Sequence, residues 1–281
     1  MVGAPFTKVL FEGFANVENV YDFPRKLLKQ PIEALRYIAQ LRSNEYDVVL
    51  NLNGGSTSDR IATLLARSKY KVAFCNDDSF TPVNRCVKRE DVSIVHEALK
   101  PLELMKIFDI KPDYTLKLSI ALNNEELAWG KKELEKVTQK EGKKVIGLFR
   151  NARYDKKLSD TFWLDLVENL QKQSDEEIAF IDILSPDVPT KLSAQMHEYA
   201  QKDLRKLAAF MANLDAFICG DTGPMHLASA SGVPTIALFK TTTPTLYGTL
   251  KESDLSLEMG DKSVERIAQE IGEHISASAG A

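Results

Sequence analysis

The sequence predicts an α/β protein made of two domains with parallel sheets. Short β-rich runs alternate with amphipathic stretches at helical period, and this alternation favours parallel strands joined by helical crossovers. The 281 residues suit two domains of roughly 100 to 150 residues each. A charged stretch at 123–144 leads from one series of these elements to the next, so we place the domains at residues 1–122 and 123–281.

The first series is the less regular one. Its expected strands are 19–23, 46–51, 71–74 and 114–120. Helices are expected to begin at Pro31 and after the Gly54-Gly55 turn, and a longer helix is expected at 96–108. Proline suits the first turn of a helix, where the N–H groups are unpaired in any case, and glycine pairs mark turns.

The second series alternates regularly enough to predict a doubly wound sheet. Its expected strands are 144–149, 178–184, 216–219 and 235–239. Its expected helices are 160–171, 191–199, 204–214 and 224–231, followed by a closing helix. The closing helix carries apolar residues on one stripe between Val264 and Ile275, so this stripe must pack against another element.

Composition and charge exclude several classes of function. The formal net charge is −4 and no basic cluster is interleaved with aromatic residues, so no nucleic-acid partner is expected. No apolar run reaches the roughly 20 residues that span a bilayer, and no signal-peptide pattern is present. Cys75, Cys86 and Cys219 form no CxxC pair, so we expect reduced thiols in a cytoplasmic protein. No GxGxxG follows a strand, which excludes a dinucleotide oxidoreductase.

The feature that carries chemistry follows the third strand of the second series. The segment Gly220-Asp221-Thr222-Gly223-Pro224 leads from that strand into a helix. Thr is a common N-cap, Gly lets an anion approach the backbone, and Pro suits the first turn. The N–H groups and the positive dipole end of a helix start suit a diphosphate. The alternative is a plain capped helix, in which Asp221 and Thr222 only accept backbone hydrogen bonds.

The continuation of this segment makes the pattern specific. The run Asp221-Thr222-Gly223-Pro224-Met225-His226-Leu227-Ala228 is followed by Gly232-Val233-Pro234, Leu238-Phe239, Pro244 and Tyr247-Gly248. This order resembles the signature of glycosyltransferase family 9, the ADP-heptose:lipopolysaccharide heptosyltransferases. Upstream, Asn151–Ser159 resembles the donor loop of that family, with its phosphate-contacting lysine at Lys157 or Lys156.

The resemblance implies two Rossmann-like domains that face a cleft, the GT-B arrangement. The C-terminal domain would hold the donor nucleotide, and the closing helix would return toward the N-terminal, acceptor-side domain. Asp221 would face the donor sugar or orient its loop, and Met225 and His226 would line the pocket, although a lone histidine on an apolar helix is also typical of a structural residue. Donor binding is thus expected at Lys156, Lys157, Asp221, Thr222, Gly223, Pro224, Met225 and His226.

The resemblance is weaker in the first half, through Gly3–Phe6, Asn51–Ser56 and the region of His96. The arginines there suit phosphates or acidic sugars of a lipid core, although surface arginines are common. His96 also suits a structural role. The acceptor-side candidates are Ser56, Arg60, Arg85 and His96.

The start of the chain departs from the family pattern. Family members begin with a strand and a Gly-Asp loop whose aspartate is the expected general base, whereas Met1 matches a point downstream of that loop. The first βαβ unit is therefore expected to be absent, which leaves the N-terminal domain incomplete and the base upstream of Met1. Three explanations are open: a truncated chain, which we favour, a partner that supplies the unit, or an inactive relative.

The resemblance implies an inverting, metal-independent glycosyltransferase that moves heptose from ADP-heptose to an inner-core lipopolysaccharide acceptor. A helix start and a lysine ammonium would stabilise the departing diphosphate, so neither a metal nor a cofactor is expected. The expected partners are the nucleotide sugar and a lipid-linked saccharide, with at most peripheral contact at the inner face of the cytoplasmic membrane. The alternative is a non-catalytic nucleotide-sugar-binding protein or a truncated form that lacks the base.

Overall fold

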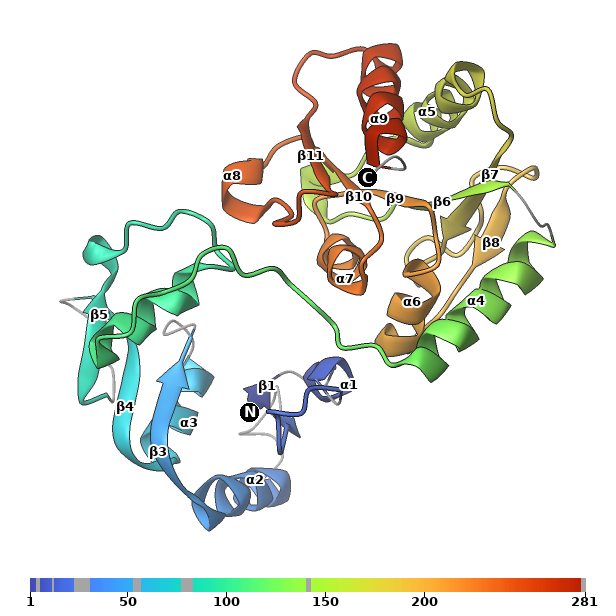
Figure 1. Cartoon of the computed structure of the whole chain (residues 1–281). Coiled ribbons are helices and arrows are strands. Elements are labelled where there is room, and N and C mark those ends of the chain that lie inside the picture. Colours follow the sequence, from blue (N-terminus) through green and yellow to red (C-terminus); the bar gives the residue numbers. More distant parts are fainter. Residues whose placement is uncertain are drawn as a thin grey trace. The chain divides into compact units, whose positions relative to one another are not determined.

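The structure confirms the α/β class and divides the chain into two compact units. The computed structural model describes residues 1–3, 6–11, 13–22, 31–52, 57–76, 83–139 and 143–278. Unit 1 comprises Met1–Lys8 and Asn19–Leu116, and unit 2 comprises Val9–Glu18 and Lys117–Ala281. Each unit contains parallel strands with helices packed on them (Figure 1).

Unit 2 is built around one six-stranded parallel sheet. Its strands are β6 (Lys144–Phe149), β7 (Ile178–Ile183), β8 (His197–Tyr199), β9 (Ala216–Gly220), β10 (Thr235–Phe239) and β11 (Leu255–Glu258). They lie in the order β11-β10-β9-β6-β7-β8. The chain starts at the middle of the sheet, builds one half outward and returns beside β6 to build the other half, which is a doubly wound topology.

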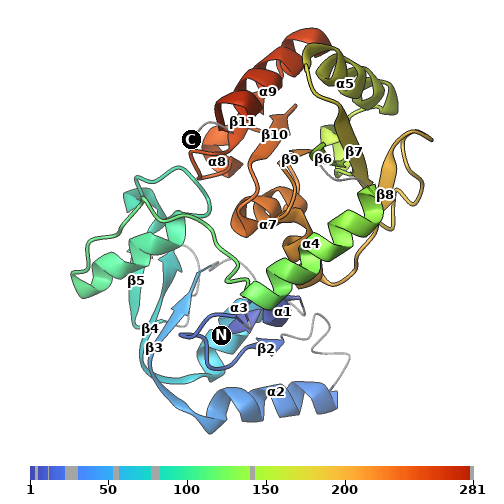
Figure 2. The same ribbon diagram turned by 45° about the vertical axis from the view of Figure 1, so that its right-hand side comes forward.

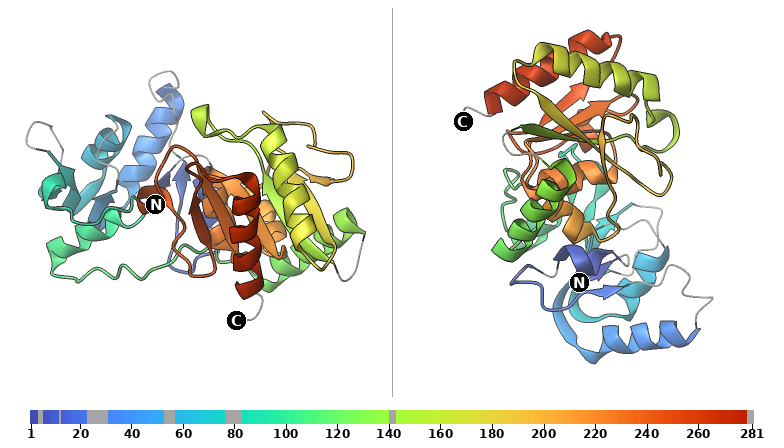
Figure 3. Two further views of the ribbon diagram at one scale, coloured as in Figure 1. Left: turned by 90° about the horizontal axis from the view of Figure 1, so that it is seen from above. Right: turned by 90° about the vertical axis from the view of Figure 1, so that its right-hand side faces the viewer.

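Helices cover both faces of this sheet. They are α4 (Asn124–Thr138), α5 (Asp160–Gln173), α6 (Leu204–Met211), α7 (Gly223–Ser231), the short α8 (Pro244–Tyr247) and α9 (Val264–Ser278). α4, α6 and α7 pack on one face and α5 and α9 on the other (Figure 3). Met225 and Phe217 are buried on the first face, and Trp163 and Ile271 on the second. The strands are therefore apolar on both sides, as sheets covered on both faces require.

Unit 1 contains two smaller parallel sheets. β3 (Glu45–Asn51), β4 (Arg67–Cys75) and β5 (Arg85–Lys88) form one, and β1 (Val2–Gly3) pairs with β2 (Tyr21–Asp22). The helices of the first half are α1 (Thr7–Phe11), α2 (Pro31–Ser43), α3 (Thr57–Leu65) and the 3-10 helices η2 (Arg89–Asp91) and η3 (Lys100–Phe108). Val72 and Phe74 of β4 pack against Leu104 of η3 to form a small core.

The expected strand at 114–120 is wrong. This segment is irregular, and within the described part of the chain it pairs with no strand. The Ile120 N–H donates instead to the Ala230 carbonyl (3.1 Å), which ties the segment to the end of α7. A segment of β-rich residues does not form a strand when no neighbouring strand is available for backbone pairing.

The expected helix at 191–199 is also wrong, since the segment is a loop that ends in β8. The Asp182 carboxylate accepts a hydrogen bond from the Leu192 N–H (2.8 Å). Tyr199 stacks on Phe210, with 3.7 Å between the ring centroids. Contacts with the sheet and with α6 therefore override the helical pattern of this segment.

The apolar stripe of α9 packs inside unit 2, against another element as its pattern predicts. Ile267, Ile271 and Ile275 are buried in one cluster with Trp163 and Leu166 of α5. The two helices lie side by side on the sheet (Figure 2). Unit 2 thus supplies a packing surface for the stripe of its closing helix.

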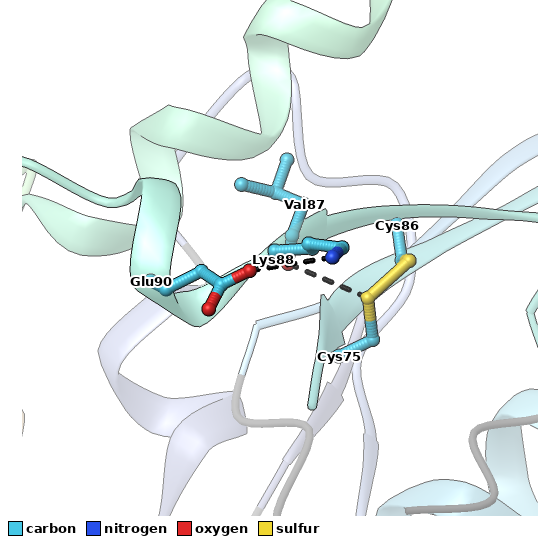
Figure 4. Close-up of a disulfide and its surroundings, with 5 residues drawn as sticks. All are labelled: Cys75, Cys86, Val87, Lys88 and Glu90. Atoms are coloured by element: carbon cyan, nitrogen blue, oxygen red, sulfur yellow. Dashed lines mark hydrogen bonds and ion pairs between the residues drawn. A yellow bond between two sulfur atoms is a disulfide. The ribbon is translucent and has the colours of Figure 1, made fainter. Parts of the chain in front are cut away.

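Cys75 and Cys86 form a disulfide (Figure 4), so the expectation of three reduced thiols is wrong for this pair. In the parallel register of β4 and β5, Ala73 lies opposite Cys86 and Cys75 lies opposite Lys88. The two cysteines therefore project from the same face, with Cα atoms 5.8 Å apart, within the range that a disulfide bridges. Cys219 is free and fully buried, and burial raises the pKa of its thiol.

Two helical glycines allow a matched test of the packing of unit 2. A Cβ on Gly130 of α4 would collide with the Ala209 carbonyl of α6, whereas a Cβ on Gly272 of α9 would meet only Gln173 Oε1, at 3.9 Å. We expect Gly130→Ala to lower the free energy of unfolding by about 1–3 kcal/mol because of overpacking. Gly272→Ala should raise it by up to about 1 kcal/mol because alanine favours helix.

Urea denaturation followed by tryptophan fluorescence measures both effects, since Trp129 and Trp163, the two tryptophans of the chain, lie in helices of unit 2. Equal shifts of the two variants in the same direction would show that α4 and α6 are not in close backbone contact.

Candidate functional site

The central strands β6 and β9 define a topological switch point in unit 2. They pair directly, with Leu148 opposite Ile218 and Phe149 opposite Cys219. After β6 the chain passes to α5 on one face of the sheet, and after β9 it passes to α7 on the opposite face. The two loops diverge at the carboxyl edge of the sheet, which is where ligands bind in open α/β folds.

The start of α7 presents backbone donors at this point. Thr222 is the N-cap in an extended conformation, and its side chain makes no capping hydrogen bond. Its hydroxyl oxygen is buried and has no hydrogen-bond partner in the described part of the chain. A Cβ added to Gly223 would meet no atom within 4 Å, so there is open space beside the first residue of the helix. The first N–H groups of a helix have no intrahelical acceptor, so they suit an anion there.

Asp221 and Lys156 bring the two loops together. Lys156 Nζ donates to Asp221 Oδ2 at 2.6 Å. The Asp221 side chain is 10% exposed and that of Lys156 is 29% exposed, so the pair is only partly screened by water. Thr242, in the loop after β10, donates its hydroxyl to the same Asp221 oxygen at 2.6 Å. The Lys156 ammonium also lies 5.9 Å from the ring centroid of Tyr247 in α8.

The loop that carries Lys156 turns tightly. Residues Tyr154–Lys156 form a single 3-10 turn, η4. Tyr154 adopts a positive φ of 57°, a region that non-glycine residues rarely occupy. The Lys157 N–H donates to the Tyr154 carbonyl at 3.4 Å. The turn directs Lys156 toward Asp221 while the Lys157 side chain is exposed.

Arg150 anchors the same loop at its start and is a residue that the sequence reasoning missed. It directly follows β6 and is buried, donating to both carboxylate oxygens of Asp182 (2.7 to 3.1 Å). It also donates to Asp160 (2.8 Å) and to the Thr190 carbonyl (2.8 Å). Burial opposes the charged guanidinium, but the contacts with Asp182 outweigh burial and raise the pKa of Arg150. The sequence does contain a signal for this pair, since Arg150 and Asp182 each stand at or near the end of an apolar strand. Buried charges of this kind need a partner.

The structure brings part of the predicted donor set together and separates the rest. Lys156, Asp221, Thr222 and Gly223 lie at the switch point, and Pro224 follows in the first turn of α7. Met225 points into the core and is fully buried, and His226 is partly buried one residue later. The Lys157 carbonyl accepts a hydrogen bond from Lys240 Nζ at 3.4 Å. Contacts of all eight residues with the donor stay predictions.

The predicted acceptor-side residues lie in unit 1. Arg60 is in α3, and the guanidinium of Arg85 in β5 lies 4.8 Å from the Tyr70 ring centroid. His96 Nδ1 accepts a hydrogen bond from the Ala98 N–H at 3.3 Å, which supports the turn before η3. Ser56 lies outside the described residues.

The chemistry of the site in unit 2 is that of anion and polyol recognition. An ammonium group, a hydroxyl and a helix start can hold a diphosphate, and the neighbouring carboxylate can accept hydrogen bonds from sugar hydroxyls. Among the described residues, no group of three or more His, Cys, Asp and Glu side chains is placed to hold a metal ion. The arrangement thus fits an anionic ligand that also carries hydroxyl groups.

Comparisons with known proteins agree with a ligand of this class. The model of glycosyltransferase family 9 (heptosyltransferase) matches residues 34–266. Lipopolysaccharide heptosyltransferase 1 of Campylobacter coli is 26% identical over 261 aligned residues, which cover 84% of this chain and 74% of that protein. The heptosyltransferase WaaC of E. coli with ADP has a TM-score of 0.74 at 20% identity, covering 97% of this chain and 89% of WaaC.

A family 9 glycosyltransferase from Veillonella parvula has a TM-score of 0.77 at 15% identity, covering 99% of this chain and 86% of that chain. At these identities the two solved structures show a shared fold, the GT-B fold of heptosyltransferases. The family match covers most of the chain and includes both Lys156 and the segment that starts at Asp221. The chain therefore belongs to glycosyltransferase family 9, the heptosyltransferase family, and is a glycosyltransferase.

Proposed function

We propose that this chain transfers heptose from ADP-heptose to an inner-core lipopolysaccharide acceptor, with inversion at the anomeric carbon. The observation that carries this proposal is the meeting of Lys156, Asp221 and the start of α7 at the switch point of unit 2. The names of the relatives agree with it, since one is a lipopolysaccharide heptosyltransferase and another was solved with ADP. Unit 2 is therefore assigned to the donor.

Departure of the diphosphate is the step that these residues would serve. As the bond between the anomeric carbon and the phosphate oxygen breaks, negative charge collects on ADP. The Lys156 ammonium, the Thr222 hydroxyl and the N–H groups at the start of α7 would donate to that charge. Because these donors can balance the leaving group by themselves, the proposed reaction is independent of a metal ion.

Inversion requires attack by the acceptor hydroxyl on the face opposite the departing diphosphate, with its proton taken by a base. We assign no described residue to that proton transfer. The acceptor of the proposed reaction is lipid-linked, so contact with the inner face of the cytoplasmic membrane would be peripheral. No helix in the described part of the chain is long and apolar enough to cross a membrane.

A second candidate is a nucleotide-sugar-binding protein without transferase activity. It is favoured by one observation, namely that the proposed donor residues are assembled within unit 2 while no described residue is assigned as base. An assay of ADP release from ADP-heptose, with a heptose-deficient lipid acceptor, separates the two. Release that depends on the acceptor supports the transferase, whereas donor binding without release supports the second candidate.

Removal of the Lys156 charge tests the donor site. We expect Lys156→Met to weaken ADP binding by roughly tenfold, because a charge-assisted contact with the diphosphate is lost. Isothermal titration with ADP measures the change. The matched control is Lys172→Met, since Lys172 pairs with Glu168 on the exposed side of α5 at 2.5 Å. Equal affinities of the two variants would remove Lys156 from the diphosphate site.

A substitution at Thr222 distinguishes a role of this residue in ligand binding from a role in helix capping. Since its side chain caps nothing, Thr222→Ala should change the free energy of unfolding by less than about 0.5 kcal/mol while weakening ADP binding. The Asp203 side chain, in contrast, accepts from the Arg205 and Lys206 N–H groups at the start of α6. Asp203→Ala should therefore cost about 1 kcal/mol with ADP affinity unchanged. Urea denaturation and titration of both variants check this, and a loss of stability in Thr222→Ala would support the capping interpretation.

A further inference from the structure

One oxygen of Asp221 holds two donors at once. Asp221 Oδ2 accepts from Lys156 Nζ and from Thr242 Oγ1, each at 2.6 Å. These side chains come from the loops after β6, β9 and β10. The three strands lie side by side in the sheet, although β6 and β9 are not consecutive in the sequence. The same lysine is the group that the proposed function assigns to the donor diphosphate. Asp221 and the diphosphate are therefore two anions that compete for one cation.

We propose that Lys156 changes partners during the reaction, from Asp221 to the diphosphate when the donor binds. The inference rests on the proposed function. The carboxylate neutralises the lysine in the structure, and this ion pair must open before the ammonium can turn to a phosphate. Asp221 thereby opposes the binding of a diphosphate that brings no sugar, both by holding Lys156 and by its own negative charge.

The sugar of the donor reverses this effect. When Lys156 leaves, the carboxylate loses one hydrogen-bond donor in a site where its side chain is only 10% exposed. A partly buried carboxylate needs replacement donors, and the hydroxyls of the transferred sugar supply them. ADP-heptose therefore gains a contact that ADP lacks. After transfer, Asp221 takes Lys156 back, which favours release of ADP.

Thr242 acts as the positioning residue in this exchange. Its hydroxyl stays on Asp221 Oδ2 when Lys156 leaves and keeps the carboxylate turned toward the sugar. The loop that carries Thr242 is fixed on both sides. Lys240 donates to the Lys157 carbonyl at 3.4 Å, and Thr243 caps α8 through the Thr245 N–H at 3.4 Å.

Asp221→Asn tests the exchange, because asparagine keeps the shape of the side chain but removes its charge. We expect ADP to bind about fivefold more tightly to this variant and ADP-heptose about tenfold more weakly, measured by isothermal titration. Glu168→Gln on α5 is the matched control, with both affinities unchanged. Equal weakening of ADP and ADP-heptose would overturn the exchange and make Asp221 a support for its loop. Absence of ADP binding to the unmodified chain would instead remove the proposed function itself.

Thr242→Val and Thr242→Ser test the positioning role. Valine keeps the size of the side chain without its hydroxyl, so we expect weaker binding of ADP-heptose with unchanged binding of ADP. Serine restores the hydroxyl and should restore the affinity for ADP-heptose. Failure of serine to rescue, or an equal loss for both ligands with valine, would contradict the role of the hydroxyl. Thermal melting of each variant, followed by circular dichroism, checks that unit 2 remains folded.

Discussion

The pairing of β6 with β9 is the constraint on which the site of unit 2 depends. Parallel strands need crossovers, and right-handed crossovers on both sides of the first strand send α5 and α7 to opposite faces of the sheet. The two loops therefore separate at the edge where Leu148 lies opposite Ile218. Arg150 and Asp182 hold the first of these loops to the end of β7. Loss of one partner of such a buried pair costs about 3–5 kcal/mol, so the position of Lys156 depends on this pair.

The sequence predicts an element correctly where its residue pattern agrees with the contacts that the neighbouring elements provide. The strands of unit 2 around β6 and β9 are mostly apolar and short, which is typical of strands covered on both faces. The segments 114–120 and 191–199 have the right residues for regular structure, but the first has no partner strand in the described structure and the second is held by Asp182. The disulfide of Cys75 likewise depends on strand register, which spacing along the chain does not reveal.

For the site, the chain pattern identifies the segments but not the individual contacts. The resemblance leaves Lys156 and Lys157 as equal candidates, and only the turn at Tyr154 separates them, by directing one side chain inward. Thr242 stands in a run of three threonines that carries no motif by itself. Its role follows from the pairing of β10 with β9, because that pairing brings two distant loops to one edge of the sheet.

The site of unit 2 therefore combines accessible groups with groups that already have a partner. The open space at Gly223 needs no rearrangement to meet an anion, so the first N–H groups of α7 can receive the diphosphate first. Lys156 is engaged by Asp221 and joins only when the gain from the phosphate exceeds the loss of the ion pair. A site with a free lysine would bind any diphosphate tightly, including the product. Because Asp221 both holds Lys156 and recognises the sugar, binding of the diphosphate and binding of the sugar are linked. When Lys156 moves to the diphosphate, the Asp221 carboxylate becomes available to accept hydrogen bonds from the sugar hydroxyls.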